Sequence, residues 1–208
     1  MTVRVEFFFD LSSPWTRLAF ANIRPALDGL DYSIAWRPFL VGGVFNAVNP
    51  SVYESRKPEN AARLARSFGW LKQWAELAGV GMNFPSEHHP LKSVNAMRFC
   101  CALEEEQVAL ERFAHAAFEA YFTHARNLDD PAVLVAVANE AGLGGAALAE
   151  RAASQPGKDC LRANTGEAIA RGAFGSPTII VHDPAGEEQL YFGNDQLPLV
   201  RAKVAALA

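Results

Sequence analysis

The segments that look like β-strands lie at the two ends of this 208-residue chain, and a long helical pattern separates them. Residues 3–9 are mainly β-branched and aromatic. In residues 32–39 the apolar side chains of Tyr32, Ile34 and Trp36 alternate with other residues, as in a strand with one buried face. A helix beginning at Pro14 is expected between these two segments. Residues 178–182 and 189–192 form a second pair of strands, joined by a turn. Because a strand–helix–strand unit usually has parallel strands, the pattern predicts one sheet assembled from both ends of the chain.

The middle of the chain is dominated by apolar residues at helical spacing. Gly42-Gly43 and residues 46–50 are expected to form a loop. Helices are then expected at 58–78, 92–104, 108–126, from Asp130-Pro131 to Gly142, at 145–153 and at 158–171, with a terminal helix from Gln196. No linker isolates an independent unit, so the simplest interpretation is one α/β domain, residues 1–42 and 171–208, interrupted by an all-helical insertion, residues 43–170.

The composition excludes several classes of protein. A formal charge of -4 argues against a general nucleic-acid binder, which normally has a basic excess. The three cysteines, Cys100, Cys101 and Cys160, are too few for a disulfide-built secreted scaffold, and the lack of a CxxC motif excludes a two-cysteine redox centre. The N-terminal residues do not resemble a signal peptide and no apolar run is long enough to span a membrane, so we expect a cytoplasmic protein with no membrane partner.

Ser13 is the first candidate for chemistry. It stands before Pro14 at the expected start of a helix, where free N–H groups and a partial positive charge favour a bound anion such as a thiolate or a phosphate. Taken alone, a Ser-Pro pair at this position is more often an ordinary helix cap.

Two further segments are expected to meet the first one in space. Pro177 directly precedes a strand, as in a tight turn that would expose the Ser176 backbone for pairing with an extended ligand. Asn194 and Asp195 follow the last strand, where Asp195 either caps the terminal helix or accepts a hydrogen bond from a ligand ammonium group. Taken singly, a strand-entry proline and a helix cap are the commoner explanations.

A set of short motifs distributed over nearly the whole chain carries a family resemblance. They are FFFDLSSPW (7–15), WRPFLVGG (36–43), Asn49-Pro50 and Arg56-Lys57, DPAVL (130–134), RANTGEAIARGAFGSPT (162–178) and YFGNDQL (191–197). This arrangement resembles the DsbA-like branch of the thioredoxin fold. More narrowly, it resembles the kappa-class glutathione transferases and their relatives, the 2-hydroxychromene-2-carboxylate isomerases. The resemblance implies a thioredoxin-like domain with a large all-helical insertion.

The resemblance also implies a glutathione site. The family's Ser-Pro-aromatic-Ser/Thr motif falls on residues 13–16, which makes Ser13 the expected catalytic and cofactor-binding position. Because serine is a poor nucleophile, it is expected to donate its hydroxyl to the thiolate of bound glutathione. Pro177 falls on the family's cis-proline and Ser176 on the residue that pairs with the cysteinyl part of glutathione. Asn194-Asp195 falls on the pair that holds the γ-glutamyl end.

Three residues are expected on the substrate side. The resemblance places Asn49 and Lys57 there, in a segment of variable length. Lys57 or Arg37 would neutralise the substrate carboxylates. Arg37 has an equally good structural interpretation, because it lies on an expected strand.

The implied function is that of a glutathione-dependent isomerase of naphthalene-type aromatic catabolism. It would interconvert 2-hydroxychromene-2-carboxylate and trans-o-hydroxybenzylidenepyruvate by transient addition of the glutathione thiolate. The partners implied are a small aromatic carboxylate and a second copy of the chain, in a homodimer. A kappa-like transferase that conjugates an electrophile and a non-catalytic thioredoxin-fold binding protein remain as alternatives. A metal site is not expected, because His88 and His89 are adjacent and have no Cys or further His nearby.

Overall fold

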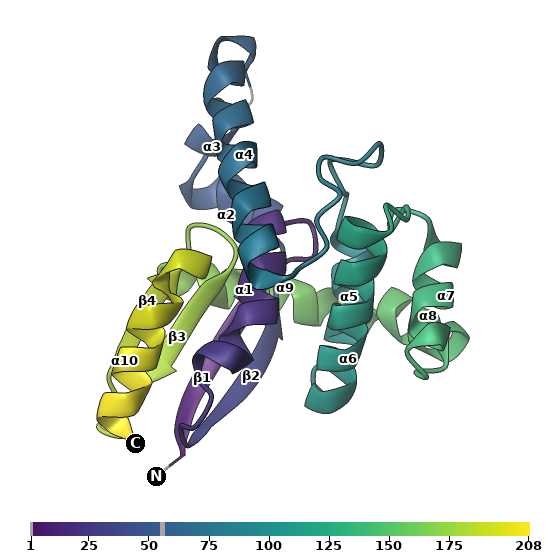
Figure 1. Cartoon of the computed structure of the whole chain (residues 1–208). Coiled ribbons are helices and arrows are strands. Elements are labelled where there is room, and N and C mark those ends of the chain that lie inside the picture. The colour runs from purple at the N-terminus through teal and green to yellow at the C-terminus, as the bar shows by residue number, and fades with distance from the viewer. Residues whose placement is uncertain (1, 55–56) are drawn as a thin grey trace.

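A computed structural model of the chain describes residues 2–54 and 57–208. Four strands form one sheet in the order β2-β1-β3-β4 (Figure 1). They are β1 (Val3–Phe9), β2 (Tyr32–Pro38), β3 (Thr178–His182) and β4 (Glu188–Phe192). β1 pairs in parallel with β2 and antiparallel with β3, which in turn pairs antiparallel with β4. The predicted assembly of one sheet from both chain ends is therefore confirmed.

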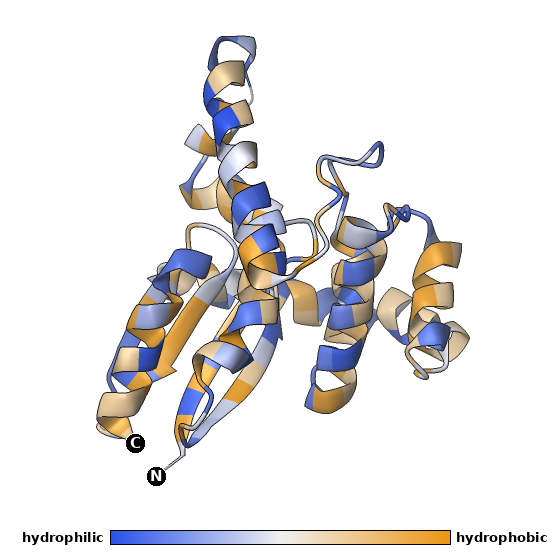
Figure 2. Ribbon diagram, in the orientation of Figure 1, coloured by the Kyte–Doolittle hydropathy of each residue, from blue (hydrophilic) through white to orange (hydrophobic). Residues whose placement is uncertain are grey.

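The sheet is buried on both faces, as the continuous apolar character of β1 predicts. On one face, Phe7 and Phe9 join a large core with α1 (Pro14–Ala26) and α10 (Leu197–Leu207). On the other face, Phe8 packs in a smaller core with α2 (Val41–Val48) and α9 (Gln155–Ala170). Figure 2 shows β3 as mostly hydrophobic and the surrounding helices as mixtures of hydrophobic and hydrophilic residues, as amphipathic helices are.

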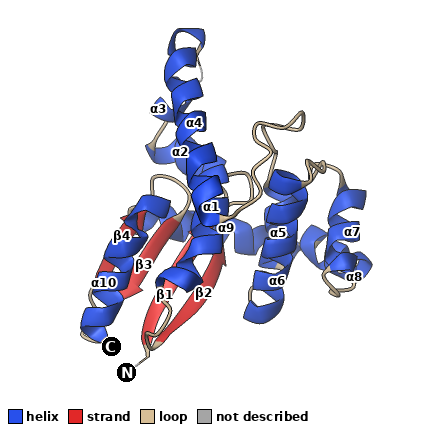
Figure 3. Cartoon of the chain, in the orientation of Figure 1, coloured by secondary structure: helices blue, strands red, loops and turns tan. Residues whose placement is uncertain are grey.

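The helical middle packs directly against the sheet core. Phe118 lies with its ring centroid 5.2 Å from that of Phe20 on α1 and 6.4 Å from that of Phe9 on β1. Figure 3 shows the strands gathered at the lower left, with further helices to their right and above them. These helices are α4 (Ala61–Ala78), α5 (Val94–Cys101), α6 (Gln107–Phe118), α7 (Pro131–Glu140) and α8 (Gly145–Ala153). None of the helices in the described part of the chain has both the length and the apolar character that crossing a membrane requires.

Most expected helices are present, but their ends differ. Three short elements lie between them: the helix α3 (Ser51–Glu54) and the 3-10 turns η1 (Pro58–Asn60) and η3 (Asn194–Gln196). The helix expected at 108–126 ends in a π-helical turn, η2 (Glu119–Thr123). α9 begins earlier than expected, because Ser154 accepts a hydrogen bond from the Gly157 N–H and acts as the cap.

The loop predicted around Gly42-Gly43 is wrong. This segment forms the helix α2, even though two glycines lower its intrinsic helix propensity. Two tertiary hydrogen bonds hold its first turn. The Val41 N–H donates to Asp10 Oδ2 over 2.8 Å, and the Leu40 N–H donates to Thr165 Oγ1 over 2.9 Å. Satisfying these otherwise unpaired donors stabilises the helix start from outside the segment.

Candidate functional site

Ser13 is the N-cap of α1, at the point where the chain leaves the C-terminal end of β1. Its Oγ accepts a hydrogen bond from the Thr16 N–H over 3.2 Å, and its hydroxyl donates to the Ser176 carbonyl oxygen over 3.1 Å. The Arg17 N–H donates to the Ser13 carbonyl oxygen, and Pro14 has no N–H. Within the described part of the chain, the Trp15 N–H has no acceptor. A helix terminus with one free N–H beside a hydroxyl is suited to holding an anion.

Ser176 joins the helix start to the segment before β3. The Ser176-Pro177 peptide bond is cis. The Ser176 hydroxyl is buried, bonds to Thr16 Oγ1 over 2.7 Å and accepts a hydrogen bond from the Asp10 N–H over 3.0 Å. The side chain of Ser176 therefore fixes the two loops against each other, and its backbone is the part that faces Ser13.

Asp10 is a buried carboxylate that the sequence interpretation did not single out. Its Oδ1 accepts a hydrogen bond from the Ser12 N–H and its Oδ2 accepts one from the Val41 N–H, while the Ser93 hydroxyl also bonds to it. Burial raises the pKa of the Asp10 carboxyl, and the two N–H donors oppose that change. An acid that directly follows a strand buried on both faces is the sequence signal that could have revealed this role.

The Asn194-Asp195 pair lies at the start of η3, close to α1. The Asn194 side chain is buried, and its Oδ1 accepts a hydrogen bond from Asn22 Nδ2 over 2.8 Å. The side chain of Asp195 is exposed and lines a hollow of about 320 Å³ together with Trp74 and Arg201. Gly193 has a φ of 94°, which favours glycine between β4 and η3. Asp195 does not cap α10, whose N-cap is Gln196, so the capping alternative is wrong.

A cavity of about 390 Å³ opens beside Ser12, the neighbour of Ser13. Its walls come from α2, from the loop that precedes α5 and from the start of α5. Apolar side chains such as Phe45 and Leu91 line it together with the polar side chains of Tyr53, Lys92 and Ser93. A mostly preformed cavity with a few polar groups is typical of a small-molecule site. The sequence interpretation missed Lys92, which no motif marks.

None of the three predicted substrate-side residues, Asn49, Lys57 and Arg37, is among the residues that line this cavity. Asn49 Nδ2 donates to the Phe174 carbonyl oxygen over 3.0 Å, which ties the end of α2 to the loop before Ser176. Lys57 is exposed and forms an ion pair with Glu54, its Nζ lying 2.5 Å from Glu54 Oε2. Arg56, part of the same motif, lies outside the described residues.

Arg37 is not among the residues that line the cavity beside Ser12. Its guanidinium forms ion pairs with Glu6, Glu104 and Glu167, and it stacks over the Phe8 ring at 5.3 Å from the centroid. A guanidinium held by three carboxylates has little capacity left for a substrate carboxylate. The contacts favour the structural interpretation of Arg37 over the substrate-binding one.

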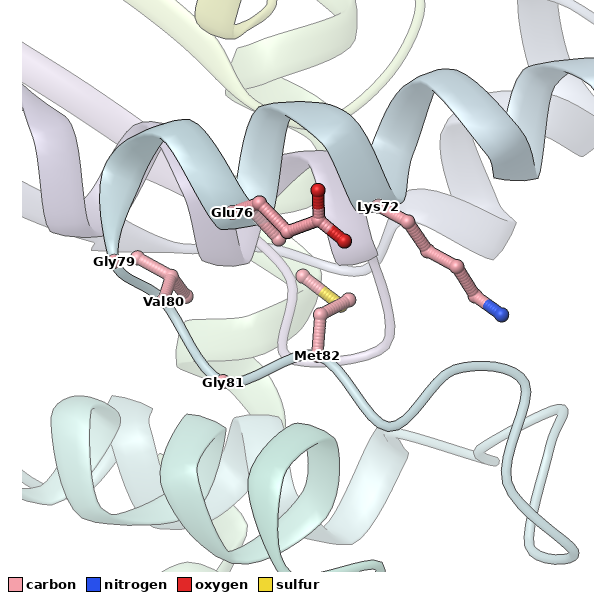
Figure 4. A pocket seen from close by; sticks show the side chains of 7 residues that line it. Lys72, Glu76, Gly79, Val80, Gly81 and Met82 are labelled. Atoms are coloured by element: carbon pink, nitrogen blue, oxygen red, sulfur yellow. The ribbon is translucent and has the colours of Figure 1, made fainter.

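Another hollow, of about 480 Å³, lies where α4 ends, away from Ser13. Figure 4 shows Met82 rising from the loop toward α4, while the Lys72 ammonium group points away from it. The hollow is lined by one carboxylate, that of Glu76, and by residues 79–82. Across the described residues, no group of three or more His, Cys, Asp or Glu side chains is arranged to hold a metal ion.

The three cysteines lie in the helical segment, Cys100 and Cys101 on α5 and Cys160 on α9. Burial raises the pKa of the Cys100 thiol, and the adjacent Asp10 carboxylate adds to that effect. The free Cys101 thiol forms a hydrogen bond with the Cys160 thiol, and this hydrogen bond together with burial raises the pKa of Cys101. Cys160 in turn donates to Glu104 Oε2 over 2.9 Å. The raised pKa values make the Cys100 and Cys101 thiols poor nucleophiles, so these two do not replace the missing cysteine beside Pro14.

Comparisons with known proteins agree with this geometry. A family model described as a DSBA-like thioredoxin domain matches residues 4–205. Glutathione S-transferase kappa 1 of Rattus norvegicus is 26% identical over 201 residues, which cover 94% of this chain and 88% of that protein. The 2-hydroxychromene-2-carboxylate isomerase of Sphingobium xenophagum is 27% identical over 203 residues, covering 97% and 98%.

A solved structure of a 2-hydroxychromene-2-carboxylate isomerase has the same fold. It superposes with a TM-score of 0.79 at 21% identity and covers 98% of this chain and 95% of that one. The order of the strands, the serine that caps α1 beside a cis-proline and the match over residues 4–205 lead to one conclusion. The chain belongs to the DsbA-like thioredoxin family, within which its relatives include kappa-class glutathione transferases and 2-hydroxychromene-2-carboxylate isomerases.

Proposed function

We propose that this protein is a glutathione-dependent isomerase that acts on a small conjugated aromatic carboxylate. The observation that carries the proposal is the pairing of the Ser13 hydroxyl with the Ser176 carbonyl oxygen, 3.1 Å apart, at a helix start that has a free Trp15 N–H and no cysteine. A site of this kind holds a thiolate but does not supply one. The sulfur nucleophile therefore comes from glutathione.

Different groups of the protein would bind the cysteinyl part and the γ-glutamyl end of glutathione. The backbone beside the cis Ser176-Pro177 bond pairs with the cysteinyl part, which brings the sulfur to Ser13 and to the Trp15 N–H. A hydroxyl has one proton, so that of Ser13 turns from the Ser176 carbonyl oxygen to the thiolate when glutathione binds. The exposed Asp195 carboxylate accepts the γ-glutamyl ammonium group. Asn194 acts indirectly, because its amide is bonded to Asn22 and fixes the start of η3 against α1.

The substrate would occupy the cavity of about 390 Å³ beside Ser12. That volume lies within the range of small-molecule sites, and its apolar wall suits an aromatic ring. The lysine on this wall is Lys92, whereas Arg37 lies outside the cavity and is paired with Glu6 and Glu104. We therefore propose that Lys92, in place of Arg37, binds the substrate carboxylate. The thiolate adds to the conjugated double bond, the ring opens, a bond rotates, and elimination restores both the double bond and free glutathione.

Turnover of 2-hydroxychromene-2-carboxylate, followed with and without glutathione, tests this function. We expect an isomeric product, no consumption of glutathione, and a large loss of rate when glutathione is omitted. Lys92→Gln should raise KM for the carboxylate about tenfold, because a charge-assisted hydrogen bond is lost. Lys72→Gln, on the exposed face of α4, is the matched control and should change neither KM nor kcat. Turnover that proceeds equally well without glutathione would contradict the proposal.

A transferase is the second candidate, favoured by the 26% identity with the rat kappa-class enzyme. It would use the same thiolate site but release a thioether. Product analysis separates the two activities, because an isomerase leaves the glutathione concentration unchanged and a transferase consumes it. A non-catalytic binding protein would show neither product.

We also propose that the protein forms a homodimer through α4. Trp70, Trp74 and Leu77 lie on one face of this helix and are 56%, 39% and 79% exposed. An exposed apolar stripe on a helix that projects from the body (Figure 1) is a typical subunit contact.

Light scattering coupled to gel filtration tests the dimer. We expect a mass near twice 22.6 kDa for the wild type and near 22.6 kDa for Trp70→Glu combined with Leu77→Glu. Val108→Glu, which places the same charge at a residue 78% exposed on α6, should leave the dimer intact. A wild-type protein that is monomeric at every concentration tested would contradict this assignment.

A further inference from the structure

A second cavity lies in the helical segment, away from the loops that carry Ser13. It has a volume of about 440 Å³, is open to solvent on one side, and is lined by residues of α5, α7, α8 and α9, which lie together in Figure 1. Its wall is largely apolar and includes Phe99, Leu134 and Ala149. Val94 lines the cavity beside Ser12 and Asn95 lines this one, so α5 separates the two.

The charged groups in this wall are cationic. Arg98 and Lys158 both line the cavity, and no acidic side chain does. The Arg98 Nε is buried and has no hydrogen-bond partner, and among the described residues neither side chain takes part in an ion pair. Asp159, which follows Lys158 in the chain, forms its ion pair with Arg162, although the Lys158 charge also acts on it. Asp130, which precedes Pro131 of the wall, accepts a hydrogen bond from the Ala132 N–H.

Arg98 differs in this respect from the other arginines with buried, unpartnered nitrogens. Arg17 pairs with Glu119, Arg37 with Glu6, and Arg171 with both Glu6 and Glu188. A buried guanidinium nitrogen without a partner is costly, and an anion that supplies an acceptor removes the cost.

We propose that this cavity is a binding site for a small organic carboxylate with a flat apolar body. The carboxylate pairs with Arg98 and Lys158, and the apolar body lies against Phe99, Leu134 and Ala149. The volume is within the range of small-molecule pockets. The site is independent of glutathione, because its wall contains neither Ser13 nor any residue of the segment around Pro177.

Methyl-resolved NMR with 1-naphthoate as the probe tests the site and separates it from the cavity beside Ser12. We expect the methyl resonances of Leu134 and Ala149 to shift in a saturable way, in the absence of glutathione. The resonances of Val41 and Leu91 report on the cavity beside Ser12 and give a separate titration curve. The neutral 1-naphthamide should shift Leu134 and Ala149 at least about tenfold more weakly, because it cannot pair with the guanidinium as an anion does.

Two variants complete the test. Arg98→Gln removes the cation, and Ala153→Phe fills the cavity from an exposed position of its wall. Each should weaken the Leu134 and Ala149 titration at least about tenfold, while leaving that of Val41 and Leu91 unchanged. Arg63→Gln, on the exposed face of α4, is the control.

The proposal is wrong if neither variant changes the Leu134 and Ala149 titration. It is also wrong if only Val41 and Leu91 respond to 1-naphthoate. Neither result bears on glutathione-dependent turnover, so failure here is distinguishable from failure of the proposed function.

Discussion

The Ser13 hydroxyl can do its proposed work only if two loops keep their relative positions, and buried polar side chains hold them there. The Ser176 hydroxyl forms a hydrogen bond with the Thr16 hydroxyl and accepts another from the Asp10 N–H. The Asp10 carboxylate in turn accepts hydrogen bonds from the N–H of Ser12, in the Ser13 loop, and from the N–H of Val41, at the start of α2. A buried polar network in which every member is satisfied fixes geometry more tightly than apolar packing alone.

Replacing Asp10 should show how much this network contributes. Asp10→Asn offers one amide oxygen where the carboxylate offers two, so either the Ser12 or the Val41 N–H loses its acceptor. We expect urea denaturation at neutral pH to show a loss of about 1–3 kcal/mol in the free energy of unfolding. Asp28→Asn, at an exposed position, is the matched control and should be neutral.

The pH dependence of the same variant carries a definite sign. Burial raises the pKa of Asp10 in the folded state, so the folded protein binds this proton before the unfolded chain does. The contribution of Asp10 to stability therefore increases as pH falls through the folded pKa toward the unfolded value of about 3.9. We expect the wild type to gain stability over Asp10→Asn in that range. A difference that stays constant with pH would show that Asp10 is not perturbed.

At the scale of elements, α2 depends on its neighbours more than on its own residues. A Cβ added at Gly43 would lie 2.9 Å from Thr165 Cγ2, whereas a Cβ at Gly42 would meet no atom within 4 Å. Two hydrogen bonds hold the Thr165 side chain in this rotamer. Its Oγ1 accepts one from the Leu40 N–H, and its hydroxyl donates one to the Leu161 carbonyl oxygen. The two adjacent glycines therefore have different roles.

This difference predicts opposite effects of the same substitution. Gly42→Ala should stabilise the protein by about 0.5–1 kcal/mol, because alanine favours a helix and the site has room. Gly43→Ala should destabilise it by about 1–3 kcal/mol, because α2 must move away from α9. Thermal and urea unfolding of the pair measure both values. If Gly43→Ala is as stable as Gly42→Ala, the close packing of α2 on α9 is not present.

The strands, the βαβ unit and the helix that begins after Ser13 could all be predicted, because local patterning and tertiary packing agree there. α2 could not, because its two glycines indicate a loop and only the hydrogen bonds from Asp10 and Thr165 favour a helix. Lys92 was missed for a related reason: it enters the cavity from a segment distant in sequence. Arg37 was ambiguous because its partners Glu6, Glu104 and Glu167 come from three separate segments.

At the scale of the whole molecule, an ion-pair network joins the two ends of the chain on the face of the sheet that α9 covers. Glu6 on β1 is 1% exposed and contacts Arg37 on β2, Arg171 after α9 and His182 on β3. Burial alone would raise the pKa of Glu6, but the hydrogen bonds from Arg171 and His182 and the positive charges lower it below its ordinary value.

Glu6→Gln should therefore destabilise the protein in a pH-dependent way. A carboxyl whose folded pKa is lowered contributes stability above its unfolded pKa, and this contribution is lost as pH falls through the folded pKa. We expect the variant to lose about 1–3 kcal/mol at neutral pH, and the gap to the wild type to close in acid. Glu105→Gln, at an exposed position, is the control. A gap that is equally large in acid would contradict the role assigned to the Glu6 charge.

The most direct test of the account is the acidity of the thiol of bound glutathione, followed by the ultraviolet absorbance of the thiolate across a pH titration. We predict that the wild type makes this thiol at least about tenfold more acidic than that of free glutathione, as helix starts do for thiols placed at them. Ser13→Ala should return the acidity most of the way to the free value. Asp195→Asn should weaken glutathione binding and leave the acidity of the bound thiol unchanged. Bound glutathione that titrates like free glutathione in the wild type would contradict the claim that Ser13 and the start of α1 hold a thiolate.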